Sequence, residues 1–311
     1  MHITVIGGNG FIGQHFVEGA VDLGHKVTVV GRKPMVAPPS QRFEYLAGGI
    51  RQLALNEDLM HRSDVICHFA SSTVPATANS DPVADISTNL VETVELLERL
   101  KRFPGKKIIY LSSGGAVYGN PQQVPISETH PLNPLGSYGI NKMAIEKYIT
   151  MYSDFYGLTS TIIRPSNPYG PGQSGTGQFG AISTFLTKAM LGEPIKVFGG
   201  GAVIRDFIYI TDLRDLLLKV LTCETSDVYN AGSGQGHSIS DIIDLVEAVT
   251  GRNIPKEHLP HRPFDPKVIV LDNAKASRAF DWTPKIDIGL GIELSYRAIL
   301  EQRHALESKL T

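Results

Sequence analysis

The chain has 311 residues, of which 42% are hydrophobic and 19% charged, as in a soluble globular protein with one large or two modest domains. The formal net charge is -2 and no block of like charge occurs, so we expect no nucleic-acid or membrane partner. Cys67 and Cys223 are far apart, so we expect no disulfide framework and predict a cytoplasmic protein. No basic leader or membrane-length apolar run occurs, and His258 and His261 in a proline-rich loop are not typical of a metal site.

Short apolar runs alternate with helical patterns through the first half of the chain. The expected strands cover residues 3–7, 26–31, 64–70, 107–113 and 160–165, and the expected helices cover 11–23, 82–104 and 138–156. Near-continuous apolar strands separated by helices are typical of a parallel sheet with both faces covered. The predicted fold class is therefore α/β, with a Rossmann-type, doubly wound parallel sheet.

The composition changes after Pro165, where a loop dense in glycine and proline begins and the later elements become shorter. This pattern predicts a smaller, mixed α/β domain that closes over the sheet. We predict a dinucleotide-binding domain over residues 1–165, joined by an element from about 206–230. The remaining part of 166–311 is predicted to bind substrate.

The segment VIGGNGFIG places Gly7, Gly10 and Gly13 between the first strand and the first helix. Such glycines allow a tight turn, a close approach of the backbone to a pyrophosphate, and close packing of the helix on the strand. The first helical residues, Phe11 and Ile12, lie at a helix N-terminus, where free N–H groups bind phosphate. We therefore predict a dinucleotide site that contains these five residues.

The end of the second predicted strand bears on the choice between NAD and NADP. NAD-specific proteins carry an acidic residue there for the ribose hydroxyls, whereas this chain has Gly31, Arg32 and Lys33. A guanidinium at this place can pair with a 2′-phosphate, so the cofactor is predicted to be NAD or NADP, with Arg32 in contact with it. Alternatively, Arg32 and Lys33 are solvated loop cations.

Several motifs follow the glycine loop in a fixed order: HFAS at 68–71, SSGGAVYG at 112–119 and SYGINK at 137–142. Later come RPSNPYGPG, RDFIYITDL, YNAGSG and RPFD. With these motifs the chain resembles the extended short-chain dehydrogenase/reductase family over nearly its whole length. It looks most like the NAD-dependent nucleotide-sugar 4-epimerases of the UDP-glucose and UDP-galactose type.

The resemblance gives a meaning to Tyr138 and Lys142, which lie four places apart on one face of a predicted helix. A phenol with a pKa of about 10 needs a nearby positive charge to act as a base near neutral pH. We expect the Lys142 ammonium to lower the pKa of Tyr138 and, by resemblance, to bind the nicotinamide ribose. Ala70 and Asn89 would line the cofactor pocket. The alternative is a packed tyrosine beside a surface lysine.

The chain departs from the family pattern at Gly114. The usual partner of the tyrosine is a Ser or Thr four residues before the tyrosine of VYG, and that position is Gly114 here. We predict that Ser113 takes this role through a shifted turn; a water or the tyrosine alone are the alternatives. Related 4,6-dehydratases need an Asp-Glu pair just after this place. Gly115 and Ala116 carry no ionisable group, which disfavours elimination.

The substrate residues are inferred from the resemblance and from the charge of a nucleotide diphosphate. Arg205 and Arg262 are predicted to bind the phosphates, although Arg205 could instead form an interdomain ion pair. Asn167 is expected to bind a phosphate or the sugar. Phe198 is expected to stack on the base and Asp265 to bind a ribose hydroxyl.

The predicted function is a nucleotide-sugar 4-epimerase that uses UDP-hexose or UDP-N-acetylhexosamine. It would oxidise the sugar transiently at C4 with a tightly bound nicotinamide cofactor. One alternative is an NADPH-dependent nucleotide 4-keto-sugar reductase, and another is a non-catalytic, dinucleotide-sensing protein. By resemblance, the helices at 82–103 and 137–156 would pair with their copies in a homodimer.

Overall fold

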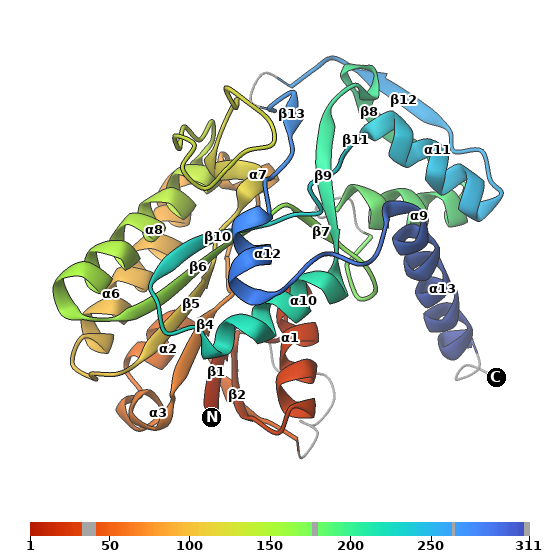
Figure 1. Cartoon of the computed structure of the whole chain (residues 1–311). Helices are drawn as coiled ribbons and strands as arrows, with labels where there is room; N and C mark the ends of the chain where they lie inside the picture. Colours follow the sequence, from red (N-terminus) through yellow and green to blue (C-terminus); the bar gives the residue numbers. More distant parts are fainter. Residues whose placement is uncertain (33–41, 176–179, 263–264, 308–311) are drawn as a thin grey trace.

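The computed structural model of the chain describes residues 1–32, 42–175, 180–262 and 265–307 (Figure 1). Its main sheet has seven parallel strands in the order β10-β6-β5-β4-β1-β2-β3. The predicted cation Lys33 lies outside the described residues. The strand bounds are β1 His2–Ile6, β2 Lys26–Gly31, β3 Glu44–Ala47, β4 Val65–His68, β5 Lys107–Leu111, β6 Thr159–Pro165 and β10 Asp227–Ala231.

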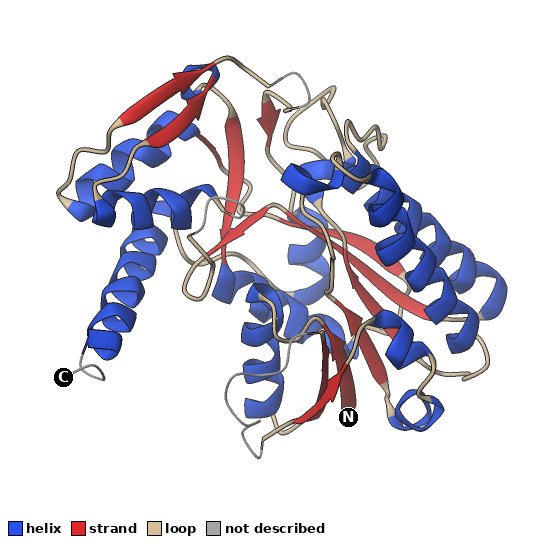
Figure 2. Cartoon of the chain, turned by 180° about the vertical axis from the view of Figure 1, so that it is seen from behind, coloured by secondary structure: helices blue, strands red, loops and turns tan. Residues whose placement is uncertain are grey.

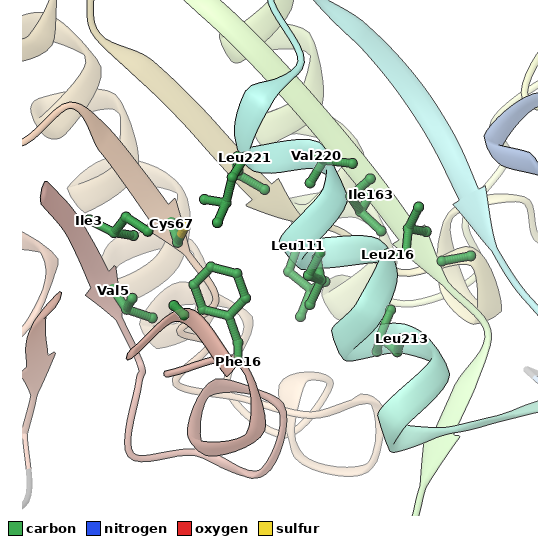
Figure 3. Close-up of a cluster of buried hydrophobic side chains, with 14 of the residues drawn as sticks. Ile3, Val5, Phe16, Cys67, Leu111, Ile163, Leu213, Leu216, Val220 and Leu221 are labelled. Carbon is green, nitrogen blue, oxygen red and sulfur yellow. The ribbon is translucent and has the colours of Figure 1, made fainter. Parts of the chain in front are cut away.

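Helices cover both faces of this sheet. On one face α1 and α10 pack against β1, β4, β5 and β6, and Figure 3 shows Phe16 from α1 in the same buried cluster as Leu213 and Leu216 from α10. Another cluster of buried side chains joins the other face to α2, α3, α6 and α8. The bounds are α1 Phe11–Asp22, α10 Ile210–Lys219, α2 Ile50–Ala54, α3 Glu57–Arg62, α6 Glu92–Leu100 and α8 Ser137–Tyr156.

A second lobe lies beyond the carboxyl ends of the main strands (Figures 1 and 2). A mixed sheet places β11 and β13 beside β9, which also pairs with β7, and β8 pairs separately with β12. This lobe has its own hydrophobic core with α9, α11 and α13. Its elements are β7 Asn167–Tyr169, β8 Ile195–Phe198, β9 Ile204–Tyr209, β11 Gly236–Ser238, β12 Lys256–Leu259, β13 Val268–Ile269, α9 Ala181–Leu191, α11 Ile239–Thr250 and α13 Ile288–Glu307.

We propose the domain division predicted from the sequence, with residues 1–165 and an element near 206–230 in the nucleotide-binding unit. The pairing of β10 with β6 and the packing of α10 against α1 support it. α12 (Ala274–Phe280) also packs against the first unit. Ala276 of this helix and Trp282, just after it, belong to the hydrophobic core that contains α1 and α10. None of the helices in the described part of the chain could span a membrane.

The predicted helix at 82–104 is interrupted in the structure. It consists of α5 (Pro82–Asp85), a π-helical turn η1 (Ile86–Val91) and α6. A π turn adds one residue per turn and therefore rotates the side chains that follow it. Here it brings Asn89 inward, so that 6% of this residue is exposed. The apolar spacing was consistent with one continuous helix and contained no signal for the extra residue.

The helix that carries the predicted catalytic tyrosine is fixed to the sheet by a buried ion pair. Arg164 of β6 donates from Nε and Nη2 to the Glu146 carboxylate of α8, with an Nη2–Oε2 distance of 2.6 Å. Arg164 also donates to the hydroxyl of Tyr118. Because both charges are buried and hydrogen-bonded to each other, loss of either one would leave an uncompensated charge. This pair therefore fixes α8 to the sheet one helical turn after Lys142.

Candidate active site

Tyr138 and Lys142 occupy the first two turns of α8, at the carboxyl ends of β4 and β5. Lys142 is 6% exposed, and its Nζ donates to the carbonyl oxygen of Leu111 at 2.8 Å. The ammonium lies 4.8 Å from the ring centroid of Tyr110 and 5.7 Å from that of Tyr138. The expected shared helix face is therefore present, and Lys142 is a buried lysine rather than a surface lysine.

The expected effect of Lys142 on the phenol is not present in this structure. Burial raises the pKa of Tyr138 to about 12, and a hydrogen bond with the Ser113 hydroxyl opposes this rise. The ammonium points toward the Leu111 carbonyl, whereas the sequence argument placed it beside the phenol oxygen. Burial also lowers the pKa of Lys142 to about 8, and the carboxylates of Glu146 and Asp85 oppose that change.

The size of these pKa shifts shows what the site still needs. To ionise at neutral pH, a phenol with a pKa of about 12 requires about 7 kcal/mol of preferential stabilisation. One ammonium at about 4 Å in a partly screened site contributes about 4 kcal/mol. Lys142 is therefore insufficient by itself, and a second source of positive charge or further hydrogen bonds to the phenolate are required.

Ser113, and not residue 114, faces the tyrosine. Ser113 lies between β5 and the short helix α7 (Gly114–Val117), and its hydroxyl is close enough to the Tyr138 phenol to lower the pKa of that phenol. A Cβ built on Gly114 would lie 2.5 Å from Cδ1 of Leu271 and 3.2 Å from the carbonyl oxygen of Arg164. The Cβ of a serine or threonine at position 114 would therefore clash with the Leu271 side chain. This geometry supports the shifted-turn interpretation over the two alternatives.

The glycine loop forms a cradle that suits a dinucleotide pyrophosphate. A Cβ on Gly13 would lie 2.2 Å from the carbonyl oxygen of Gly7, and one on Gly7 would lie 2.8 Å from Cα of Ala70. Gly7 also has a φ of +84°, which L side chains rarely adopt. Helix α1 begins after Gly10 without a side-chain cap, so its first N–H groups remain available to an anion.

Phe11 and Ile12 supply backbone N–H groups in the first turn of α1, but their side chains have another role. Both pack against the hydrophobic cluster of the second lobe, and the Phe11 ring meets His15 edge to face at 5.8 Å. The imidazole of His15 in turn contacts the carbonyl oxygen of Pro171 at 2.9 Å. The helix that begins at the phosphate cradle is therefore in direct contact with the second lobe.

Asn89 orders the segment that follows β4, where Ala70 lies. Its Oδ1 accepts from the backbone N–H of Ser72 at 2.9 Å, and its Nδ2 donates to Asp85 at 2.7 Å. Asn89 therefore acts on the predicted cofactor wall through the backbone. Asp85 was missed in the sequence analysis, although it precedes Asn89 by four residues on the same inward face.

At the end of β2 the structure adds a residue that the sequence analysis did not identify. A Cβ on Gly31 would lie 2.7 Å from Nδ2 of Asn9, so the Asn9 amide occupies the space that an acidic side chain at 31 would enter. Arg32 is exposed beside Gly49. The part of the predicted cofactor site at the end of β2 therefore contains the Asn9 amide and the Arg32 guanidinium.

Four predicted substrate residues form one cluster in the second lobe. Arg205 pairs with the carboxylate of Asp265, and the Arg262 guanidinium stacks on the Phe198 ring at 3.5 Å from its centroid. The backbone N–H of Asp265 donates to the carbonyl oxygen of Arg262 at 3.1 Å, which joins the two pairs. The face of Phe198 that was predicted to stack on a base is covered by Arg262 here, so stacking on that face requires the guanidinium to move.

Asn167 stands between this cluster and the catalytic pair. Its Nδ2 donates to the carbonyl oxygen of Asp206 at 2.9 Å. Its Oδ1 would lie 3.8 Å from a Cβ on Gly115, near the turn that carries Ser113. Asn167 therefore lies close to the turn that carries Ser113.

The family model of the NAD dependent epimerase/dehydratase family matches residues 3–232. This chain belongs to that family. A UDP-glucose 4-epimerase of Mycolicibacterium smegmatis is 31% identical over 301 residues, which cover 94% of this chain and 96% of that protein. The predicted family is thus confirmed, and with it the predicted enzyme class of nicotinamide-dependent epimerases.

Solved structures of the family have the same fold. A UDP-glucose 4-epimerase of Thermotoga maritima, determined with UDP-glucose, gives a TM-score of 0.91 at 29% identity and covers 97% of this chain and 100% of that chain. A UDP-glucuronic acid 4-epimerase of Bacillus cereus, determined with UDP-glucuronic acid and NAD, gives 0.88 at 27% identity, with coverage of 97% and 100%. The predicted Rossmann-type fold class is confirmed.

Gly13→Ala tests the phosphate cradle. The added methyl would clash with the Gly7 carbonyl and push the loop from the helix, and overpacking of this kind costs about 1–3 kcal/mol. We expect NAD to bind at least about tenfold more weakly in isothermal titration calorimetry. Gly24→Ala is the control for a strained glycine replacement away from the cradle: its φ is +80°, but nothing lies within 4 Å of its Cβ, so NAD affinity should be retained. Equal NAD affinity in wild type and Gly13→Ala would contradict the cradle.

Proposed function

We propose that this protein is a nucleotide-sugar 4-epimerase that acts on a UDP-hexose or a UDP-N-acetylhexosamine. The observation that carries the proposal is the placement of the Ser113 hydroxyl beside the Tyr138 phenol, with the buried Lys142 ammonium one helical turn away. This group stands at the sheet edge that also carries the glycine cradle. The UDP-sugar 4-epimerases among the relatives support the proposal.

In the proposed reaction Tyr138 removes the proton from the sugar 4-hydroxyl, and Ser113 holds that hydroxyl and the phenol in line. The nicotinamide, when bound, supplies the hydride acceptor and a positive charge. Lys142 stabilises the developing phenolate from behind the ring and binds the adjoining ribose. Tyr138 returns the proton to the sugar oxygen after the 4-keto sugar has turned its other face to the site.

The second-lobe cluster is proposed to hold the nucleotide diphosphate. Arg262 is exposed, and Arg205 is paired with Asp265; both guanidinium groups can bind phosphate oxygens bidentately. Asp265 is then free to accept from a ribose hydroxyl, and Phe198 becomes available to the base once Arg262 turns to the phosphates. Asn167 is proposed to contact the sugar or the phosphate nearest to it.

Sugar NMR of the protein with UDP-glucose, UDP-N-acetylglucosamine or their 4-epimers tests this function. The wild type is expected to interconvert at least one pair, and Tyr138→Phe to lower the rate about 10²–10⁴-fold, because the base is lost. Ser113→Ala is expected to lower it as well, and Tyr148→Phe, on the exposed side of the same helix, should not. Unchanged turnover in Tyr138→Phe would contradict the assignment. Stoichiometric consumption of NADPH with a 4-keto sugar would instead favour the reductase.

We propose that the cofactor site accepts NADP as well as NAD, because Asn9 and Arg32 stand where a carboxylate would repel the 2′-phosphate. Arg32→Ala is then expected to weaken NADP binding about tenfold or more, the value of one charge-assisted hydrogen bond. NAD binding should change little. Calorimetry with both dinucleotides measures the difference, and an equal loss for NAD and NADP would contradict the role of Arg32.

We further propose a cytoplasmic homodimer that forms through α6 and α8. The two cysteines are free, which suits a reducing compartment. Exposed apolar side chains occur on α8 and on η1, which leads into α6, and include Ile86 (42%), Val91 (43%), Ile140 (49%) and Tyr148 (40%). A groove of about 760 Å³ is lined by Leu90, Val91, Val94 and Tyr148 and also by charged side chains that include Arg51, Glu95 and Arg99. Exposed apolar side chains with a polar surround are typical of an interface.

Val91→Lys tests the dimer. A charge within an apolar interface costs free energy unless it is paired, so we expect this variant to be monomeric at micromolar concentration, whereas the wild type is dimeric, by light scattering. Leu191→Lys is the matched control, because Leu191 is exposed on the second lobe. A monomeric wild type would exclude the dimer.

A further inference from the structure

Asp85 is a buried carboxylate beside the proposed catalytic pair, and the reaction described above does not use it. It is 1% exposed and lines a small internal cavity together with Tyr138, Lys142 and Asn89. Its Oδ1 accepts from Thr73 at 2.6 Å and from Asn89 at 2.7 Å, and its Oδ2 accepts from the hydroxyl of Ser137 at 2.8 Å. The carboxylate thus ties the π-helical turn to the first residue of α8.

The charge of Asp85 has no cationic partner among its hydrogen bonds. The three donors found in the described part of the chain are two hydroxyls and one amide, all neutral. Glu146, the other carboxylate near Lys142, is already bound by the Arg164 guanidinium through two nitrogen atoms. A buried charge is retained only where an opposite charge compensates it. The remaining positive charge that lines the same cavity is the Lys142 ammonium.

The buried charge of Lys142 likewise needs an opposite charge to compensate it. Its one hydrogen bond in the described structure goes to a neutral carbonyl, and its other close neighbours are the rings of Tyr110 and Tyr138. His68 also faces it, but burial and the Lys142 charge lower the pKa of that imidazole to about 3, so it stays neutral. From the surrounding elements, therefore, Lys142 faces two tyrosines, a neutral histidine, the paired Glu146 and Asp85.

We propose that Asp85 is a positioning residue for the reaction, as the counter-charge that keeps Lys142 an ammonium and as the anchor of the Ser137–Tyr138 turn. Its catalytic meaning rests on the proposed epimerase function. The carboxylate has opposite effects on the two partners. It favours the charged form of Lys142 and disfavours the charged form of Tyr138.

This arrangement predicts how the pH dependence changes when the charge is removed. The site works with Tyr138 deprotonated and Lys142 protonated, so the ionisations of the phenol and of the lysine together set the two limbs of the rate profile. Loss of the Asp85 charge lowers both pKa values. Both limbs therefore move toward acid, whereas a residue with only a structural role would lower the rate at every pH without moving the limbs.

Asp85→Asn is nearly isosteric and can retain all three contacts. The amide oxygen can accept from Thr73 and Asn89, and the amide nitrogen can donate to Ser137, whose hydroxyl can turn to accept. We expect both limbs of the UDP-sugar epimerisation profile to move toward acid by roughly one pH unit, the scale of a nearby charge. Ser137→Ala keeps the carboxylate and should lower the rate without moving the limbs. Asp81→Asn, which removes an exposed charge from the N-cap of the same short helix, should leave the profile unchanged.

A second measurement does not depend on turnover. In protein labelled with ¹⁵N at the lysine Nζ, the Lys142 resonance, assigned with Lys142→Met, reports its titration midpoint. We expect a midpoint near 8 in the wild type and a lower one in Asp85→Asn. A lower midpoint without epimerisation of any UDP-sugar by the wild type would support the counter-charge and reject the proposed function. An unchanged midpoint in folded Asp85→Asn would overturn the inference.

Discussion

The burial of the Lys142 ammonium is the constraint on which the arrangement of the site depends. An ammonium removed from water loses its hydration, and burial accordingly lowers the pKa of Lys142 to about 8. The structure offsets this loss with the Leu111 carbonyl, the faces of two tyrosine rings and the two carboxylates Asp85 and Glu146. A charge held in this way is little screened by water, although its effect on the pKa of the Tyr138 phenol is not present in this structure.

The parallel sheet brings the parts of the site together. The chain leaves β1 into the glycine cradle, β4 into the Ala70 segment and β5 into the Ser113 turn, and parallel strands open these turns at one edge. Helix α8 then crosses that edge and is held by the buried pair of Arg164 and Glu146. Its first turn is joined to the π-helical turn through Asp85. The reactive groups thus stand on rigid elements that are fixed from two sides.

The sequence predicted much of this site because local patterns were sufficient for it. The glycine spacing, the four-residue step from Tyr138 to Lys142 and the order of the motifs each follow from chain-local geometry. The electrostatics were harder to predict. The four-residue spacing predicts an ammonium beside the phenol oxygen, whereas in the structure the ammonium points to the Leu111 carbonyl and the phenol has a raised pKa. Asn9 and Asp85 were overlooked because their importance comes from residues distant in the sequence, Gly31 for Asn9 and Ser137 for Asp85.

The sequence by itself determined the fold class, the position of the dinucleotide cradle and the residues of the candidate catalytic pair. These properties depend on hydrophobic periodicity and short spacings, which neighbouring residues encode. Only the tertiary structure decided that Ser113 rather than residue 114 meets the phenol, that a π-helical turn interrupts the helix after Asp85, and that Asp85 and Lys142 line one cavity. Each of these outcomes depends on distances between elements far apart in the chain, and those distances are set by packing across the sheet.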